Sequence, residues 1–263
     1  MQLRHIATLV LGLVLLGAGS AATAAPERVT ASLDLQAELR LVSTRAGACP
    51  SGVSATTLCP SRRGEGSAPG LGNATVAYSY LVDEVPPACP LGSVKVLGYP
   101  VRLVVAGKGE LQIAVAERSE CLEAPAGISA GQAFAITGGT GIYAGAEGSG
   151  TVTRALGSTD AGAAGTETWA GTLTVPGLEF DVTRPTIAGA ANRIVRAKRG
   201  EKTARVVFRV SARDDRDGTL VTRCTSRSGS KFKVGRTRVS CSATDTSANT
   251  ATVAFTVTVR KAR

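Results

Sequence analysis

The strongest constraint on the fold is a strict two-residue alternation between Val29 and Leu41. Successive side chains of an extended chain point to opposite sides, so this period predicts a strand with one buried face. The residues between the apolar positions are polar or charged. The apolar side consists of Val29, Ala31, Leu33, Leu35, Ala37, Leu39 and Leu41.

The same alternation returns further along the chain. A glycine-rich turn at residues 107–109 joins the apolar-alternating segments 101–105 and 111–115, which predicts a hairpin. Residues 76–82 alternate in the same way, and few stretches repeat apolar residues at helical spacing. Short strands separated by such turns favour a sandwich or a barrel. About eight strands between residues 25 and 182 predict a closed or nearly closed β-barrel, because closure removes exposed strand edges.

A glycine-rich run occupies residues 138–150, directly after the short apolar segment 134–137. Its sequence, Gly-Gly-Thr-Gly-Ile-Tyr-Ala-Gly-Ala-Glu-Gly-Ser-Gly, resembles the signature of the allene oxide cyclase and dirigent-like barrel superfamily. The resemblance implies a β-barrel over residues 25–182, but the catalytic residues of the cyclase have no counterpart here. A nucleotide site would need a third glycine at the right spacing and a following helix, and the sequence offers neither. We therefore expect these glycines to permit tight corners and positive φ.

The charge balance inverts near Arg184-Pro185-Thr186. Residues 25–183 carry 10 Lys and Arg against 15 Asp and Glu, for a net charge of −5. Residues 184–263 carry 19 against 5, for a net charge of +14. An asymmetry of this size predicts two domains that meet different partners.

Residues 184–260 resemble the HYR (hyalin repeat) module. The matching segments are Val206–Phe208, Asp214–Gly218, Val221, Cys224, Ser228–Gly235, Thr237–Cys241, Ala243–Asn249 and Val253–Val259. Lys233 stands where proline is usual, and Ala248 stands where glycine is usual. The resemblance implies an immunoglobulin-like β-sandwich of the kind found in extracellular adhesion proteins, with no catalytic residues. The predicted fold class is therefore all-β: a β-barrel-like N-terminal domain followed by an immunoglobulin-like sandwich.

The first 24 residues predict a signal peptide. Arg4 and His5 precede an apolar core at residues 6–17 that is too short to span a bilayer, and residues 22–24 form an A-x-A cleavage site. We expect cleavage after Ala24 and a secreted, extracellular protein without a transmembrane segment. His5 is the only histidine, so the mature chain would hold none. This excludes histidine general bases, Ser-His-Asp triads and His-ligated metals.

Six cysteines in an exported protein predict disulfides rather than metal ligands. Cys224 has Cys241 as its partner within the second domain. The first domain holds four cysteines, which allow three pairings: Cys49, Cys59, Cys89 and Cys121. Sequence proximity favours joining the first to the second and the third to the fourth.

Two acidic clusters invite a chemical interpretation. An EF-hand loop starting at Asp214 would need an acidic ligand at its twelfth position, where Thr225 stands. We therefore expect Asp214, Asp215 and Asp217 to form an Asx-type turn, while a looser calcium site stays open. The second cluster, Glu117, Glu120 and Glu123, could supply paired carboxylates, but we interpret it as a solvated loop beside Cys121. We predict no catalytic residue, no metal ligand and no cofactor.

The basic surface of the second domain is the clearest functional signal. Such a density of cations attracts polyanions through its long-range field. The residues predicted to contact an anionic surface are Arg205, Arg209, Arg213, Lys231, Lys233, Arg236 and Arg238. The expected partners are an anionic polysaccharide, a wall polymer or lipid headgroups. Nucleic acid is not expected for an exported protein, and the lack of surface aromatic residues interleaved with the cations further disfavours single-stranded nucleic acid.

The sequence thus favours a secreted, non-enzymatic binding or adhesion protein. The alternative is a barrel that binds or isomerises a small lipophilic compound. Convergent polar groups in a barrel cavity would favour the alternative, and a core filled by aliphatic side chains would favour the first hypothesis.

Overall fold

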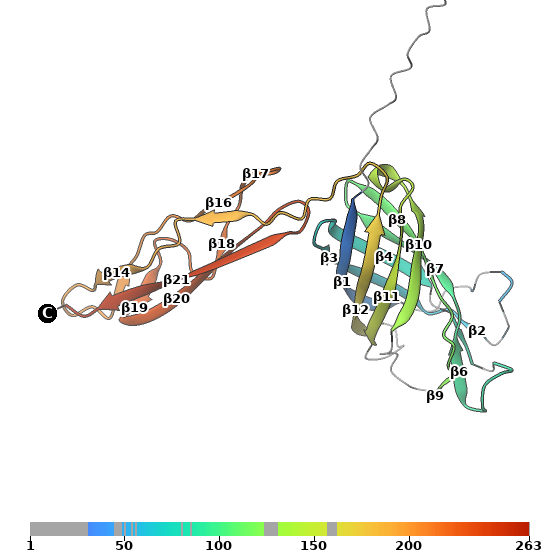
Figure 1. Cartoon of the computed structure of the whole chain (residues 1–263). Helices are drawn as coiled ribbons and strands as arrows, with labels where there is room; N and C mark the ends of the chain where they lie inside the picture. Colours follow the sequence, from blue (N-terminus) through green and yellow to red (C-terminus); the bar gives the residue numbers. More distant parts are fainter. Residues whose placement is uncertain are drawn as a thin grey trace, which may run out of the picture.

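The computed structural model describes residues 31–44, 49, 51–53, 55, 57–79, 81–84, 86–123, 131–156 and 162–262. The predicted signal peptide lies outside the described residues, as do Val29, Thr30 and Tyr80. Two all-β bodies follow one another along the chain, a barrel and an elongated sandwich (Figure 1). The predicted all-β fold class is confirmed. In the part of the chain that the structure describes, no helix is long and apolar enough to cross a bilayer.

The first body is a closed barrel, as the sequence predicts. β1 (Ser32–Thr44) closes it by pairing antiparallel with β12 (Ala164–Thr174) on one side and β3 (Ser61–Ala68) on the other. The remaining barrel strands, in spatial order from β12 to β3, are β11 (Glu147–Leu156), β10 (Gln132–Gly139), β8 (Gly109–Val115), β7 (Tyr99–Val105) and β4 (Gly72–Ser79).

The alternation along β1 separates the two sides of the barrel wall. The apolar side from Leu33 to Leu41 is buried, with each side chain at most 4% exposed, while the residues between are exposed. β4, β7, β8 and β10 show the same alternation of buried and exposed residues. Their buried side chains form one hydrophobic core.

A small sheet lies beside the barrel, and two disulfides cross-link the segments around it. Its strands, in spatial order, are β2 (Thr57–Leu58), β5 (Val82–Asp83), β6 (Ser93–Val96) and β9 (Leu122–Glu123). Cys49 is joined to Cys59 and Cys89 to Cys121, which is the pairing that sequence proximity favours.

The glycine-rich run forms the corner between β10 and β11. It contains a single 3₁₀ turn, η1 (Gly141–Tyr143), in which Gly141 has a φ of +61°. A Cβ at Gly141 would lie 2.3 Å from the carbonyl oxygen of Lys108, and one at Gly150 would lie 2.1 Å from that of Ala170. Close backbone approach therefore explains these glycines, in agreement with the structural interpretation of the motif.

The second body is a sandwich of short sheets. Its strands are β13 (Thr186–Ala188), β16 (Ser211–Asp214) and β17 (Gly218–Leu220) in one sheet; β14 (Arg193–Arg196), β21 (Thr250–Arg260), β20 (Gly235–Thr244) and β18 (Arg223–Cys224) in another; and β15 (Thr203–Arg205) with β19 (Lys231–Lys233). Phe208 and Phe255 meet edge to face in the core, at a centroid distance of 5.0 Å. The Cys224–Cys241 disulfide joins β18 to β20.

Apolar and basic residues alternate from Arg205 to Arg213, but this segment is not one continuous strand. β15 ends at Arg205 and β16 begins at Ser211. Val206 and Phe208 are still buried and Arg209 is exposed, so the pattern of faces is right. The ladder breaks because the Phe208 backbone N–H donates to the Ser228 hydroxyl, 3.0 Å away, instead of to a neighbouring strand.

Side chains connect the two bodies where they meet. Lys108, in the turn between β7 and β8, donates to the Leu71 carbonyl at 2.7 Å and to the Ser247 hydroxyl at 3.4 Å. Asn249, from the β20–β21 turn, donates to the Asp181 carbonyl at 2.8 Å.

Candidate functional site

All seven cations predicted to contact an anionic surface are exposed. The structure distributes them over three sheets. Arg205 and Lys231 are cross-strand partners in the β15–β19 pair, where Lys233 also lies. Arg213 belongs to β16, and Arg209 precedes that strand. The remaining two, Arg236 and Arg238, lie two residues apart on β20 and therefore share one side of its sheet.

The pairing of Arg205 with Lys231 places like charges directly opposite each other, which disfavours the fold slightly. Arg205 also donates from Nη1 to the Gly229 carbonyl at 2.8 Å. Its guanidinium therefore has a structural contact as well as a surface charge. No comparable hydrogen bond within the described residues ties the side chains of Lys231 or Lys233.

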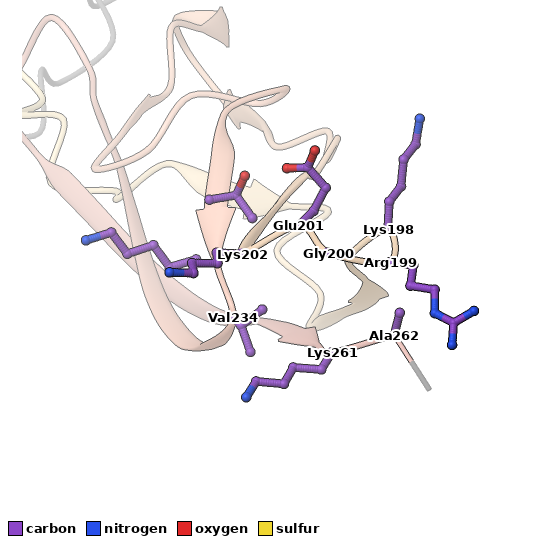
Figure 2. Close-up of a pocket in the computed structure, with 10 residues that line it drawn as sticks. Lys198, Arg199, Gly200, Glu201, Lys202, Val234, Lys261 and Ala262 are labelled. Atoms are coloured by element: carbon purple, nitrogen blue, oxygen red, sulfur yellow. The ribbon is translucent and has the colours of Figure 1, made fainter.

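A basic pocket lies at the end of the sandwich where the C-terminus is found, away from the barrel (Figures 1 and 2). We call it the tip pocket. It has a volume of about 900 Å³ and is open to solvent. Five cations and one acid are among the residues that line it: Lys198, Arg199, Gly200, Glu201, Lys202, Thr203, Lys233, Val234, Lys261 and Ala262.

The tip pocket forms where two parallel strands end at the same edge of their sheet. β14 pairs with β21 in parallel, so that Arg196 lies beside Arg260 and both strands end at the same edge. The Ala197 backbone N–H continues the pairing by donating to the Arg260 carbonyl at 2.9 Å. The charged segments that follow the two strands, residues 198–202 and 261–262, therefore emerge side by side.

The charged ends in the tip pocket do not converge on one point. Figure 2 shows Lys198 and Arg199 directed to one side, and Lys202 and Lys261 directed to the other. A small anion is held by donors that meet at one place, whereas spread cations create a broad positive field. The arrangement therefore suits a long polyanion better than a small one.

Of the cations in the tip pocket, sequence reasoning named only Lys233. The run of Lys198, Arg199 and Lys202 was visible in the sequence, as was Lys261. What the sequence could not supply was the parallel β14–β21 pairing, which brings residues about sixty positions apart to one edge.

The barrel interior holds a polar network that the sequence analysis missed. Arg154 on β11 and Glu167 on β12 are cross-strand partners, with Nε 2.6 Å from Oε1. The Tyr78 hydroxyl donates to Glu167 at 2.9 Å and accepts from Arg154 at 3.1 Å, while Arg154 Nη1 donates to Gln132 at 2.8 Å. The Arg154 guanidinium also lies over the rings of Tyr78 and Tyr99. The network is therefore extensively bonded within itself.

Burial shifts the pKa values of two groups in this network, Glu167 and Tyr78. It raises the pKa of the Glu167 carboxyl, and the neighbouring Arg154 opposes that rise. Burial likewise raises the pKa of the Tyr78 hydroxyl, with the Glu167 charge acting in the same direction. The tyrosine thus stays a neutral donor to the carboxylate.

The barrel core is filled by large side chains. Trp169, Leu35, Leu39, Leu103 and Leu111 are each at most 1% exposed. A ligand-sized cavity would leave accessible surface on the side chains that line it, and these described side chains have almost none. The polar groups converge in a filled core and not in a cavity, which the alternative hypothesis needs. The filling is not wholly aliphatic, which the first hypothesis needs, because Trp169, Arg154 and Glu167 are part of it.

The cluster of Glu117, Glu120 and Glu123 is only in part the solvated loop that the sequence analysis expects, because Glu123 lies in β9. Glu117 pairs with Lys95 at 2.7 Å, and Glu120 pairs with Arg118. The hydrogen bonds from Arg118 and Ser119 lower the pKa of Glu120 to about 2, which is opposite to the shift that a general acid needs. Glu123 pairs with Ser93 across the small sheet instead.

Asp214 forms the expected Asx-type turn. Its Oδ1 accepts the backbone N–H of Arg216 at 2.9 Å and that of Asp217 at 3.1 Å. Asp217 in turn accepts from the Thr246 backbone N–H at 2.7 Å, and Asp215 is exposed. The three carboxylates therefore differ: Asp214 accepts the N–H groups of the turn, Asp217 bonds to Thr246, and Asp215 is exposed to solvent.

Comparison with known proteins finds a family match for the second body. The HYR domain family matches residues 180–259. No curated protein matches the chain. Among solved structures, the chain is similar to "Structure of the pterocarpan synthase dirigent protein GePTS1", at 14% identity and a TM-score of 0.28, over 58% of this chain and 89% of that one. The C-terminal part of the chain, residues 180–259, is therefore an HYR domain that follows a closed β-barrel.

Proposed function

We propose that the chain is a secreted, non-enzymatic adhesion protein whose HYR domain binds an anionic polysaccharide outside the cell. The observation that carries the proposal is the charge of residues 184–263, +14, with cations exposed on every sheet of the domain. The tip pocket concentrates five of them. The three disulfides and the HYR domain are consistent with an extracellular protein.

A polysaccharide fits the tip pocket better than a compact ligand. Its charges repeat along a chain, so they can meet cations that point in different directions. The nearby Arg196 and Arg260, exposed where β14 and β21 end, extend the positive surface beyond the pocket. The barrel, with a net charge of −5, would not compete for the same partner.

Binding of the full chain to polygalacturonate, with neutral dextran as the control polymer, tests this proposal. We expect saturable binding that weakens steeply with added salt, because exposed charges are screened over about 8 Å at physiological ionic strength. Anionic vesicles form a second arm. Binding to vesicles without binding to polygalacturonate would refute a polysaccharide partner.

Two charge-matched variants locate the contact. The tip variant carries Lys198→Ser, Arg199→Ser and Lys202→Ser, and the matched variant carries Arg205→Ser, Arg209→Ser and Arg213→Ser. Both remove three positive charges, so a non-specific field would weaken equally in both. We expect the larger loss of affinity in the tip variant. Equal loss of affinity in both variants would mean that the positive charge of the whole domain attracts the polymer, without a specific contact at the tip pocket. If the full chain shows no salt-dependent binding, the cations only solvate the surface and the proposal is wrong.

A further inference from the structure

Three aspartates that are far apart in the sequence meet where the two bodies join. Asp181 lies in the segment that leaves the barrel, Asp214 ends β16, and Asp245 follows β20. One carboxylate oxygen of each lies within 4.8 Å of the others. Their exposed fractions are only 8%, 3% and 7%, so all three carboxylates are withdrawn from solvent together.

One of these carboxylates has an oxygen with nothing to bind. Asp214 Oδ1 is occupied by the two N–H groups of its turn. Its other oxygen, Oδ2, is buried and has no hydrogen-bond partner among the residues that the structure describes. A buried carboxylate oxygen left in this way is costly unless a cation or a donor approaches it.

The nearby side-chain cations are engaged elsewhere. Arg216 pairs with Glu179 at 3.3 Å, and Lys108 donates to Leu71 and Ser247. No ion pair joins a Lys or Arg of the described chain to any of the three aspartates.

We propose that Asp181, Asp214 and Asp245 bind a calcium ion that fastens the segment leaving the barrel to the β16 and β20 strand ends of the HYR domain. The ligands are hard carboxylate oxygens, which calcium prefers. Calcium–oxygen distances of about 2.3–2.6 Å place ligands on opposite sides of the ion roughly 4.6–5.2 Å apart. Three oxygens within 4.8 Å of one another therefore fit around one such ion.

The surroundings can complete the coordination. Calcium takes about 6–8 oxygen ligands, so carboxylates alone do not saturate it. A pocket of about 250 Å³ at the junction is lined by Asp181 and Asp217, together with Lys108 and Tyr143 of the barrel, so water can approach the cluster on the Asp181 side. Asn249 links two members of the cluster, because its amide donates to the Asp181 backbone carbonyl at 2.8 Å and to Asp245 Oδ2 at 2.9 Å.

The site has a mechanical consequence. Its three ligands come from the segment that leaves the barrel, from the end of β16 and from the β20–β21 turn, so one ion would hold these three segments together. Without the ion, mutual repulsion of the carboxylates would loosen the joint. The inference stands apart from polysaccharide binding, since the tip pocket lies at the other end of the HYR domain (Figure 1).

Calorimetric titration of the full chain, first treated with EDTA and dialysed, with CaCl₂ tests the proposal. We expect one ion to bind per chain. Asp214→Asn should weaken binding about tenfold or more, because it removes charge from the cluster while its side-chain oxygen still accepts the turn's N–H bonds. Asp215→Asn is the matched control, since Asp215 is exposed in the same turn, and should bind as the wild type does.

Three results would overturn the proposal. They are no calcium binding by the wild-type chain, unchanged binding by Asp214→Asn, and equal affinity for MgCl₂. Asp245→Asn serves as a second test should Asp214→Asn fail to fold by circular dichroism. Small-angle scattering adds an independent readout: calcium should narrow the distribution of distances between barrel and sandwich, and EDTA should broaden it. An unchanged distribution would contradict the proposed role at the joint.

Discussion

Arg154→Met removes the cation beside the buried Glu167 carboxylate and keeps a long apolar side chain in the barrel. Both side chains of the pair are at most 1% exposed. Removing one partner of such a pair leaves a buried charge without its counter-charge, which costs about 3–5 kcal/mol. We therefore expect the free energy of unfolding of the barrel to fall by about that amount near neutral pH.

The loss should depend on pH in a defined direction. Burial raises the pKa of Glu167 in the folded state, and without Arg154 the pKa rises further. A carboxyl whose pKa is raised on folding favours the fold below its unfolded pKa, about 4.3, and that contribution is lost as pH rises through the folded pKa. The deficit of the variant relative to the wild type should therefore shrink as the pH is lowered toward that value.

Adding Glu167→Gln to Arg154→Met removes the stranded charge. The Gln oxygen can still accept the Tyr78 hydroxyl, so we expect most of the lost stability to return. Urea unfolding followed by tryptophan fluorescence measures this. Trp169 is the chain's only tryptophan and packs against Phe134 in the barrel core, at a centroid distance of 5.0 Å, so it reports the barrel alone. A double variant as unstable as the single one at neutral pH, or a deficit that does not change with pH, would refute the reasoning.

The remaining predictions concern the HYR domain and processing. Replacing Cys224 and Cys241 with Ala should lower the stability of the HYR domain by about 3 kcal/mol, since the bridge closes a loop of 17 residues; calorimetry resolves this, and a change confined to the barrel transition would contradict it. Ala248→Gly should stabilise the same domain by about 1 kcal/mol, because Ala248 has a φ of +64°, which glycine adopts without strain; a lower midpoint would count against this. Intact mass after alkylation without reduction should show a chain starting at Ala25 with no modified thiol, and any alkylated cysteine would contradict full pairing.

Local features of the sequence were sufficient to predict the fold class and the broad organisation. Alternation along β1 predicts which side is buried, because the two-residue period of a strand is a property of the backbone itself. The inversion of charge near Arg184 separates the two bodies, and the chain order of the cysteines favours the pairing that the structure has. Each of these conclusions needs only residues that are neighbours along the chain.

The sites depend on contacts that no local pattern contains. Arg154 meets Glu167 only through the register of β11 and β12, and Lys261 joins Lys198 only because β14 and β21 run parallel. Register and strand order are set by packing of the whole domain, since shifting a strand by one residue would turn every side chain to the other face. The sequence therefore determined that the second domain is basic and where its acidic turn lies. Only the tertiary structure decided which of those charges stand together.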